Sequence, residues 1–188
     1  MRTRGSSRST KVELVEPGEE FEATYRSYVH ELLERKEPLI PAILECDASD
    51  FGALIRRLRQ DAAGVDLPEG YVPASCFWLV AEHKTLVGVA QLRHSLNAAL
   101  SYEGGHIGYS VRPSLRNKGY GKVLLKLSLE RAKSSGISWV LLTCDKSNGA
   151  SARVIQYNGG RLDSEVPRKD GKGITQRYWI NLGQAKAF

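Results

Sequence analysis

The sequence has few of the residues that build disulfide frameworks and metal centres. Its 188 residues include three cysteines, Cys46, Cys76 and Cys144, and four histidines. The cysteines are too few and too scattered for a disulfide framework or a zinc knuckle, and no histidine has a ligand-like spacing to carboxylates or cysteines. These shortages argue against a small disulfide-stapled fold. They predict a protein without a metal site, in a reducing, cytoplasmic compartment.

Long apolar runs are also missing. None approaches the ~18 residues that cross a bilayer, so no membrane-spanning segment is expected. Residues 1–10 are basic and serine-rich, without the apolar core of a secretory signal. The expectation is a flexible arm over residues 1–10 and a single domain over residues 11–188, because this length is typical of one domain.

The positive charge is concentrated in one half of the chain. Residues 1–110 hold 12 Lys and Arg against 16 Asp and Glu, whereas residues 111–188 hold 15 against 5. A basic half favours a polyanionic ligand, such as nucleic acid, a membrane surface or a phosphorylated cofactor, or it is a solvated basic face. Aromatic residues in this half are few and are not interleaved with cations, which argues against a nucleic-acid platform.

Hydrophobic periodicity predicts a mixed α and β protein. An amphipathic helix is expected over Glu19–Lys36, and a second helix from Phe51, capped by Ser49 or Asp50. The His83–Lys84 turn predicts a hairpin, and Gly88 a bulge or a close backbone approach. The expected strands are Lys11–Glu16, Phe77–Glu82, Thr85–Leu92, His106–Val111, Ser138–Cys144, Arg161–Val166 and Ile174–Leu182.

The stretch from His106 to Cys144 predicts a βαβ unit. A strand is followed by a helix that is apolar over most of its surface and ends at Gly136, and then by a nearly continuous apolar strand. Such a unit has parallel strands and a right-handed crossover. A shorter helix follows, whose apolar face includes Val154, and Tyr157 is expected to pack in the core.

Two glycines, Gly119 and Gly121, lie where a loop enters the first of these helices. The first N–H groups of a helix have no internal acceptor, and glycine lets a phosphate approach them. Arg116, Lys118 and Lys122 add positive charge at the same place. The loop is therefore either a pyrophosphate site or a tight turn. Its spacing does not match a Walker-type loop or a dinucleotide fingerprint.

The run from Val111 to Gly121, VRPSLRNKGYG, resembles the acetyl-CoA signature of the GNAT N-acetyltransferase superfamily, [RQ]-x-x-G-x-[GA] after a strand. The later run with Asn148, Ser151 and Gly159 resembles the second motif of that superfamily. The order of expected elements matches from Val12 to Leu182. The runs over residues 105–111 and 143–148 look like one bacterial branch of predicted acetyltransferases.

The resemblance implies a three-layer α/β/α fold of the α+β class. Its mixed, mostly antiparallel sheet would have about seven strands, and the strands His106–Val111 and Ser138–Cys144 would splay apart to admit the pantetheine arm of acetyl-CoA. Asn148 would bind the cofactor or cap a loop. The residues implied to bind acetyl-CoA are Tyr109, Ser110, Val111, Arg116, Asn117, Lys118, Gly119, Tyr120, Gly121, Lys122, Asn148 and Ser151.

Acetyl transfer to a primary amine needs a base, because an ammonium must lose its proton before it attacks the thioester. The resemblance puts His106 at the position of the base, with Glu103 as the competitor and a structural histidine as the alternative. In the superfamily a tyrosine serves as the general acid, and the corresponding position in this sequence is Ile155, which cannot donate a proton. Tyr109, Ser110 or water is left for that task.

The acceptor is expected to be a small-molecule amine or a peptide amine, handled by a monomer or a homodimer. An acidic rim near the first two helices would suit a cationic amine, or it is a solvated helix face. A non-catalytic acyl-CoA binding module is the alternative function, and a nucleic-acid-binding domain is a third. The acidic rim comprises Glu31, Glu34, Glu37, Glu45, Asp47 and Asp50.

Overall fold

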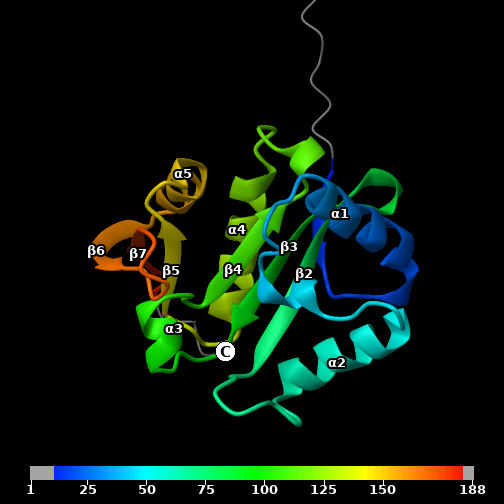
Figure 1. Cartoon of the computed structure of the whole chain (residues 1–188), viewed down its shortest axis with the longest axis horizontal. Coiled ribbons are helices and arrows are strands. Elements are labelled where there is room, and N and C mark those ends of the chain that lie inside the picture. The colour runs from blue at the N-terminus through cyan, green and yellow to red at the C-terminus, as the bar shows by residue number, and fades with distance from the viewer. Residues whose placement is uncertain (1–10, 184–188) are drawn as a thin grey trace, which may run out of the picture.

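The computed structural model describes residues 11–183, so the arm predicted over residues 1–10 lies outside the described residues. This part of the chain forms seven strands and five α-helices (Figure 1). The strands are β1 (Glu13–Val15), β2 (Ala74–Ala81), β3 (Thr85–Arg93), β4 (Ile107–Val111), β5 (Trp139–Asp145), β6 (Arg161–Pro167) and β7 (Ile174–Asn181). The helices are α1 (Glu22–Glu34), α2 (Phe51–Ala63), α3 (Ala98–Tyr102), α4 (Tyr120–Ser134) and α5 (Gly149–Tyr157).

The strands form two antiparallel sheets, of order β1-β2-β3-β4 and β5-β7-β6. The α+β class and the seven strands are as predicted. The order β4, α4, β5 is also as predicted, but no parallel ladder joins the two strands in the described residues. One isolated bridge, Gly105 with Leu142, connects them, and its pattern is antiparallel. Beyond this bridge β4 and β5 separate. The predicted splay of the two strands is therefore present, and the predicted parallel pairing is not.

The β2–β3 hairpin confirms two predictions about its backbone. The expected hairpin forms, although its connection has three residues, Glu82–Lys84, of which His83 and Lys84 have positive φ angles of 59° and 57°. Leu79 pairs with Gly88 but Val80 pairs with Leu86, which makes a bulge beside Gly88. A Cβ atom at Gly88 would lie 2.6 Å from the Ser110 carbonyl oxygen, so glycine also permits a close approach to β4.

The first sheet is covered on both faces. Helices α1 and α2 pack on one face around the buried Trp78, together with Tyr25 and Phe51. On the other face Leu124 of α4 packs against residues of β2 and β3, while Leu125 joins the core of the second sheet. Helix α4 is therefore buried on two sides, as its apolar circumference predicts, and it holds the two sheets beside each other.

The predicted cap of α2 and the predicted end of α4 are found, whereas β2 begins three residues earlier than predicted, at Ala74. Asp50 caps α2 by accepting from the Ala53 N–H at 2.8 Å, and Gly136 follows α4 with a φ of 83°. The short helix α3 was not expected. The expectation that Tyr157 packs in the core is wrong, because its side chain is 67% exposed. Helix α5 ends at Tyr157, and its inward face is occupied by Ile155, which is fully buried.

Candidate functional site

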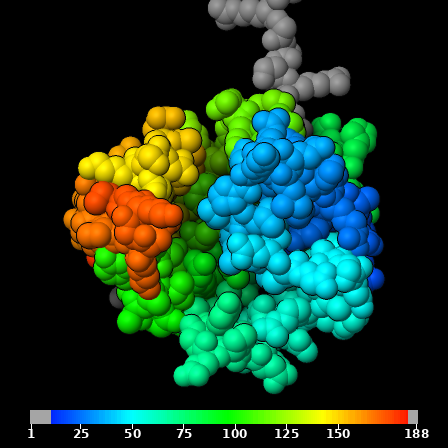
Figure 2. All heavy atoms as spheres, in the orientation of Figure 1, coloured from blue at the N-terminus to red at the C-terminus, as the bar shows by residue number. Residues whose placement is uncertain are grey.

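A cleft opens where β4 and β5 part. Figure 2 shows a hollow between the yellow and orange surface of α5, β6 and β7 and the blue surface of α1 and the segment after it. The Arg112 N–H donates to the Val87 carbonyl, so the N–H groups of Val111 and Tyr109, one and three residues earlier on the same strand, point away from β3. They face the gap, and one wall of the cleft thus presents backbone donors.

The glycine loop presents further donors at the N-terminus of α4. Gly119 is the N-cap, with a φ of 85°, and a Cβ atom there would meet nothing within 4 Å. The N–H groups of Lys122 and Val123 both donate to the Gly119 carbonyl. Those of Gly119, Tyr120 and Gly121 donate to no acceptor in the described residues. Unpaired donors at the positive end of a 15-residue helix suit a phosphate.

The predicted cations around this loop differ in what they contact. The Arg116 guanidinium donates to both carboxylate oxygens of Glu37, at 2.9 and 2.5 Å, and to the Val111 carbonyl at 3.0 Å. The Lys122 Nζ lies 3.9 Å from the centroid of the Tyr157 ring. Lys118 is exposed and forms no ion pair with another described residue. Arg116 therefore ties the loop to the segment after α1, and Lys118 keeps its charge available at the loop.

Helix α1 is tied to the same loop by Glu31. Its carboxylate accepts from the Arg112 Nε at 2.7 Å, from the Ser114 N–H at 2.6 Å and from the Ser114 hydroxyl at 3.0 Å. Burial acts to raise the pKa of Glu31, but these hydrogen bonds outweigh it and the pKa is lowered. Two members of the predicted acidic rim, Glu31 and Glu37, are thus neutralised by arginines and are less available to a cationic acceptor.

The second motif gives a capped helix beside the cleft. The Asn148 Oδ1 accepts from the Ser151 N–H at 3.0 Å, so Asn148 caps α5, as its alternative role predicted. The Ser151 hydroxyl lies 3.2 Å from the Tyr109 hydroxyl. Burial raises the pKa of Tyr109 to about 12, so the phenol is neutral at neutral pH. A proton-carrying group from β4 therefore reaches α5, the helix in which Ile155 replaces the superfamily's tyrosine.

His106 is engaged in the backbone at the point where the strands part. Its N–H donates to the Leu141 carbonyl at 2.7 Å, and its Nδ1 accepts from the Leu141 N–H at 2.9 Å. Burial and the nearby charge of Arg93 lower the pKa of His106. The neutral ring that accepts at Nδ1 carries its hydrogen on Nε2. Neither nitrogen is then free to take a proton from a substrate.

Glu103 and Ser110 also have partners. The Glu103 carboxylate accepts from the Thr175 hydroxyl at 3.1 Å and from the Lys169 N–H at 3.3 Å, and Arg168 lies 3.7 Å away. Its side chain keeps 24% of its surface exposed. The Ser110 hydroxyl lies 2.6 Å from the Tyr28 hydroxyl and donates to the Ile40 carbonyl, on the α1 side of the sheet. Ser110 and Tyr109 therefore lie on opposite faces of β4, and Ser110 is not beside α5.

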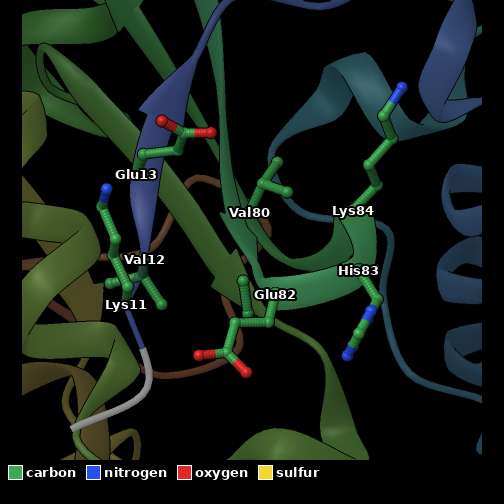
Figure 3. Close-up of a pocket in the computed structure, with 8 residues that line it drawn as sticks. Lys11, Val12, Glu13, Val80, Glu82, His83 and Lys84 are labelled. Atoms are coloured by element: carbon green, nitrogen blue, oxygen red, sulfur yellow. The ribbon is translucent and has the colours of Figure 1, made fainter.

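Two pockets elsewhere in the described chain are lined by none of the predicted site residues. Within residues 11–183, no three His, Cys, Asp or Glu side chains are grouped so that they could hold a metal ion. No helix in that range is long and apolar enough to cross a membrane. A shallow pocket lies between β1 and the β2–β3 turn, lined by residues such as Lys11, Glu13 and Glu82 (Figure 3). None of the predicted site residues lines it.

One protein-family model matches the chain. The model of the acetyltransferase (GNAT) family matches residues 40–159, a range that includes both motifs. Among curated proteins, no sequence matches the chain.

Solved structures share the fold at low sequence identity. The microcin self-immunity acetyltransferase MccE, solved with acetyl-CoA and AMP, has a TM-score of 0.66 at 16% identity, over 92% of this chain and 93% of that one. An acetyltransferase from Salmonella typhimurium that modifies the N-terminal serine of a ribosomal protein has a TM-score of 0.66 at 16% identity, over 93% and 96% of the two chains. A mutant of the spermidine N-acetyltransferase SpeG from Vibrio cholerae has 0.62 at 14%, over 90% and 93%.

The family model covers well over half of the chain, and it includes the strands that part and the helix whose first N–H groups are unpaired. The chain belongs to the acetyltransferase (GNAT) family, as an enzyme that takes its acetyl group from acetyl-CoA.

Proposed function

We propose that the protein moves the acetyl group of acetyl-CoA to a primary amine by direct transfer. The observation that carries this proposal is the gap between β4 and β5, which leads to the unpaired N–H groups of α4. One continuous line of donors suits a ligand with a pyrophosphate at one end and an acyl group at the other. Acetyl-CoA has that shape, and its phosphates suit the basic half of the chain.

Each part of the cleft has a task in binding. The N–H groups of Gly119, Tyr120 and Gly121, with the charge of Lys118, would hold the pyrophosphate. The N–H groups of Tyr109 and Val111 face the gap, where they would hold the acyl end and polarise the thioester carbonyl. These are donors fixed by the sheet and the helix, so they need little rearrangement when the ligand arrives.

Tyr109 and Glu103 are the proposed acid and base. The amine nitrogen bonds to the carbonyl carbon, its proton passes to Glu103 through water, and the carbon–sulfur bond breaks. Tyr109 donates to the leaving thiolate and regains its proton from solvent. The Glu103 oxygens keep lone pairs after accepting their present hydrogen bonds, whereas both nitrogens of His106 are committed. His106 is then a positioning residue.

An amine acceptor is in keeping with the structural neighbours. One is described as a spermidine N-acetyltransferase, and another modifies an N-terminal serine. The low identities mean that these enzymes support the reaction type and leave the acceptor of this chain to experiment.

The test is release of free CoA thiol from acetyl-CoA, measured with polyamines, aminoglycosides, amino acids and peptides as acceptors. Acceptor-dependent release is expected. Tyr109→Phe and Glu103→Gln should each lower kcat by about 100-fold, the usual contribution of a positioned acid or base. If the protein binds acetyl-CoA in calorimetry but acetylates no member of the panel, the proposed transfer fails for these acceptors, and the options left are an acceptor outside the panel or an acyl-CoA binding module.

A further inference from the structure

Arg93 is a cation placed beside the start of β4. It ends β3, and its N–H donates to the His106 carbonyl at 2.8 Å. Alternate residues of a strand share a face, so Arg93 lies on the same face as Val89, which packs in the core under α1 and α2. Leu92 points the other way, into the core that α4 covers. Arg93 therefore lies on the side of the sheet opposite α4.

The contacts of Arg93 use only part of its guanidinium. Its Nη1 donates to the carbonyls of Gly104 and Gly105, at 3.2 and 3.0 Å. In the described residues, Nε and Nη2 donate to no acceptor, and no carboxylate forms an ion pair with this side chain. A Cβ atom at Gly108 would lie 3.9 Å from Nη2, which places that nitrogen next to β4. Burial lowers the pKa of Arg93, as expected for a cation without a counter-ion.

The acidic side chains at the two ends of the cleft have other partners. Glu31 and Glu37 are held by the arginines of the glycine loop, and Glu103 lies by Arg168. A partly buried cation without an anionic partner is costly, and a bound anion removes that cost. The guanidinium fork matches a carboxylate in particular, because two parallel N–H groups face two oxygens.

We propose that Arg93 binds a carboxylate of the acceptor, so that the substrate is an amine that also carries a carboxylate, such as an amino acid or a peptide with a free C-terminus. This inference rests on the proposed function, because it identifies the acceptor of that reaction.

Matched acceptors test the proposal directly. Amino acids and dipeptides are compared with their C-terminal amides in the thiol-release assay. The free acids should have a kcat/KM about 10- to 100-fold higher, the usual effect of one charge-assisted bidentate contact. Arg93→Gln should remove this difference by lowering kcat/KM for the acids alone, and Arg93→Lys, which keeps the charge but not the fork, should be intermediate. Equal kcat/KM for acids and amides in the wild type would overturn the proposal.

A binding measurement separates this inference from the proposed function. The Nε–H signal of Arg93 in an NMR spectrum, assigned by its loss in Arg93→Lys, is followed while N-acetylglycine or N-acetylglycinamide is added to the CoA-bound protein. A saturable shift with the acid alone supports the carboxylate site even if no amine is acetylated, in which case only the proposed transfer fails. No shift with the acid, or the same shift with the amide, overturns the inference. Thermal melting of both variants shows whether they remain folded.

Discussion

The glycine loop and the segment that leads into β4 lie at two ends of one cleft, and they treat their polar groups in opposite ways. In the loop, the N–H groups of Gly119, Tyr120 and Gly121 have no acceptor in the described residues. In the segment over residues 103–106, the backbone N–H and the Nδ1 atom of His106 both have partners, Leu141 in each case. Free donors at a helix terminus are set for a ligand, whereas engaged groups hold the strands in place.

This difference changes how His106, a candidate base in the sequence, is interpreted. The sequence presents His106 as a titratable group at the right place on a strand. The structure shows that its Nδ1 replaces a backbone acceptor for Leu141, at the point where β4 leaves β5. A side chain that completes the backbone pairing positions the cleft, and it does so best while neutral.

The largest effect is expected from a substitution in the glycine loop, whose N–H groups have no acceptor in the described residues. Gly119→Ala would put a methyl group in front of the unpaired N–H groups, and the KM for acetyl-CoA should rise about 100-fold, because two charge-assisted hydrogen bonds of about 1.5 kcal/mol each would be lost. Gly136→Ala is a matched control, with a φ of 83° against 85° and open space in both cases. Both variants should melt a few degrees lower. An equal KM for the two would contradict the pyrophosphate site.

Two substitutions of His106 test the segment that leads into β4. In His106→Asn the amide oxygen takes the place of Nδ1 and still accepts from Leu141, so activity should stay within about 3-fold of the wild type. In His106→Gln that acceptor is displaced, and leaving the buried N–H unpaired costs about 2 kcal/mol, or about 30-fold in activity if the cleft is distorted to the same extent. The pH–rate profile of His106→Asn should match the wild type. If His106 were the base, both variants would be inactive.

A smaller effect is expected where α1 holds the glycine loop. Glu31→Gln removes the charge that Arg112 and Ser114 contact, and the KM for acetyl-CoA should rise about 5-fold with little change in kcat, because the loss is about 1 kcal/mol of positioning. Glu34→Gln is the control on the same helix, since its side chain is 64% exposed. A KM that is unchanged in Glu31→Gln would mean that the loop keeps its shape without α1.

The smallest effect concerns stability at high pH. Burial raises the pKa of Tyr28 and of Tyr109 to about 12, above the ordinary value of 10.0. The folded state therefore favours the neutral phenols. The stability they contribute is fully present below about pH 10, the pKa of an unfolded tyrosine, and is lost as the pH rises toward about 12. The thermal midpoint of the wild type should fall between pH 9 and pH 12. The fall should be less steep in Tyr109→Phe. It should be unchanged in the control Tyr71→Phe, because Tyr71 is 70% exposed. A fall that is the same in all three proteins would exclude this role of Tyr109.

Features that depend on neighbouring residues were predictable from the sequence. The bulge at Gly88, the cap at Asp50 and the order β4, α4, β5 each follow from a few consecutive residues. The glycine loop belongs to the same group, because a helix N-terminus has unpaired donors wherever the helix lies. Tyr157, which the sequence placed in the core, shows the limit of this reasoning. Tyr157 is the last residue of α5, and the point at which the helix ends decides whether that residue is buried.

The contacts between distant residues could not be predicted. Arg116 and Glu37 are 79 residues apart, and Arg112 and Glu31 are 81 apart. No periodicity or spacing relates them, so the loop cations appeared free and the acidic rim appeared available. The partners of His106 and Arg93 are likewise set by how β4 meets β5 and the residues before it.

The sequence by itself determined the elements, the glycine loop and the resemblance to an acetyltransferase, because local backbone preferences and short motifs act over a few residues. Tertiary structure alone decided which polar groups stay free. Arg116, Glu31 and His106 found partners from distant strands and helices, while the first N–H groups of α4 and part of Arg93 did not. The reason is that a hydrogen bond needs its two groups within about 3 Å, and only the packed chain sets those distances.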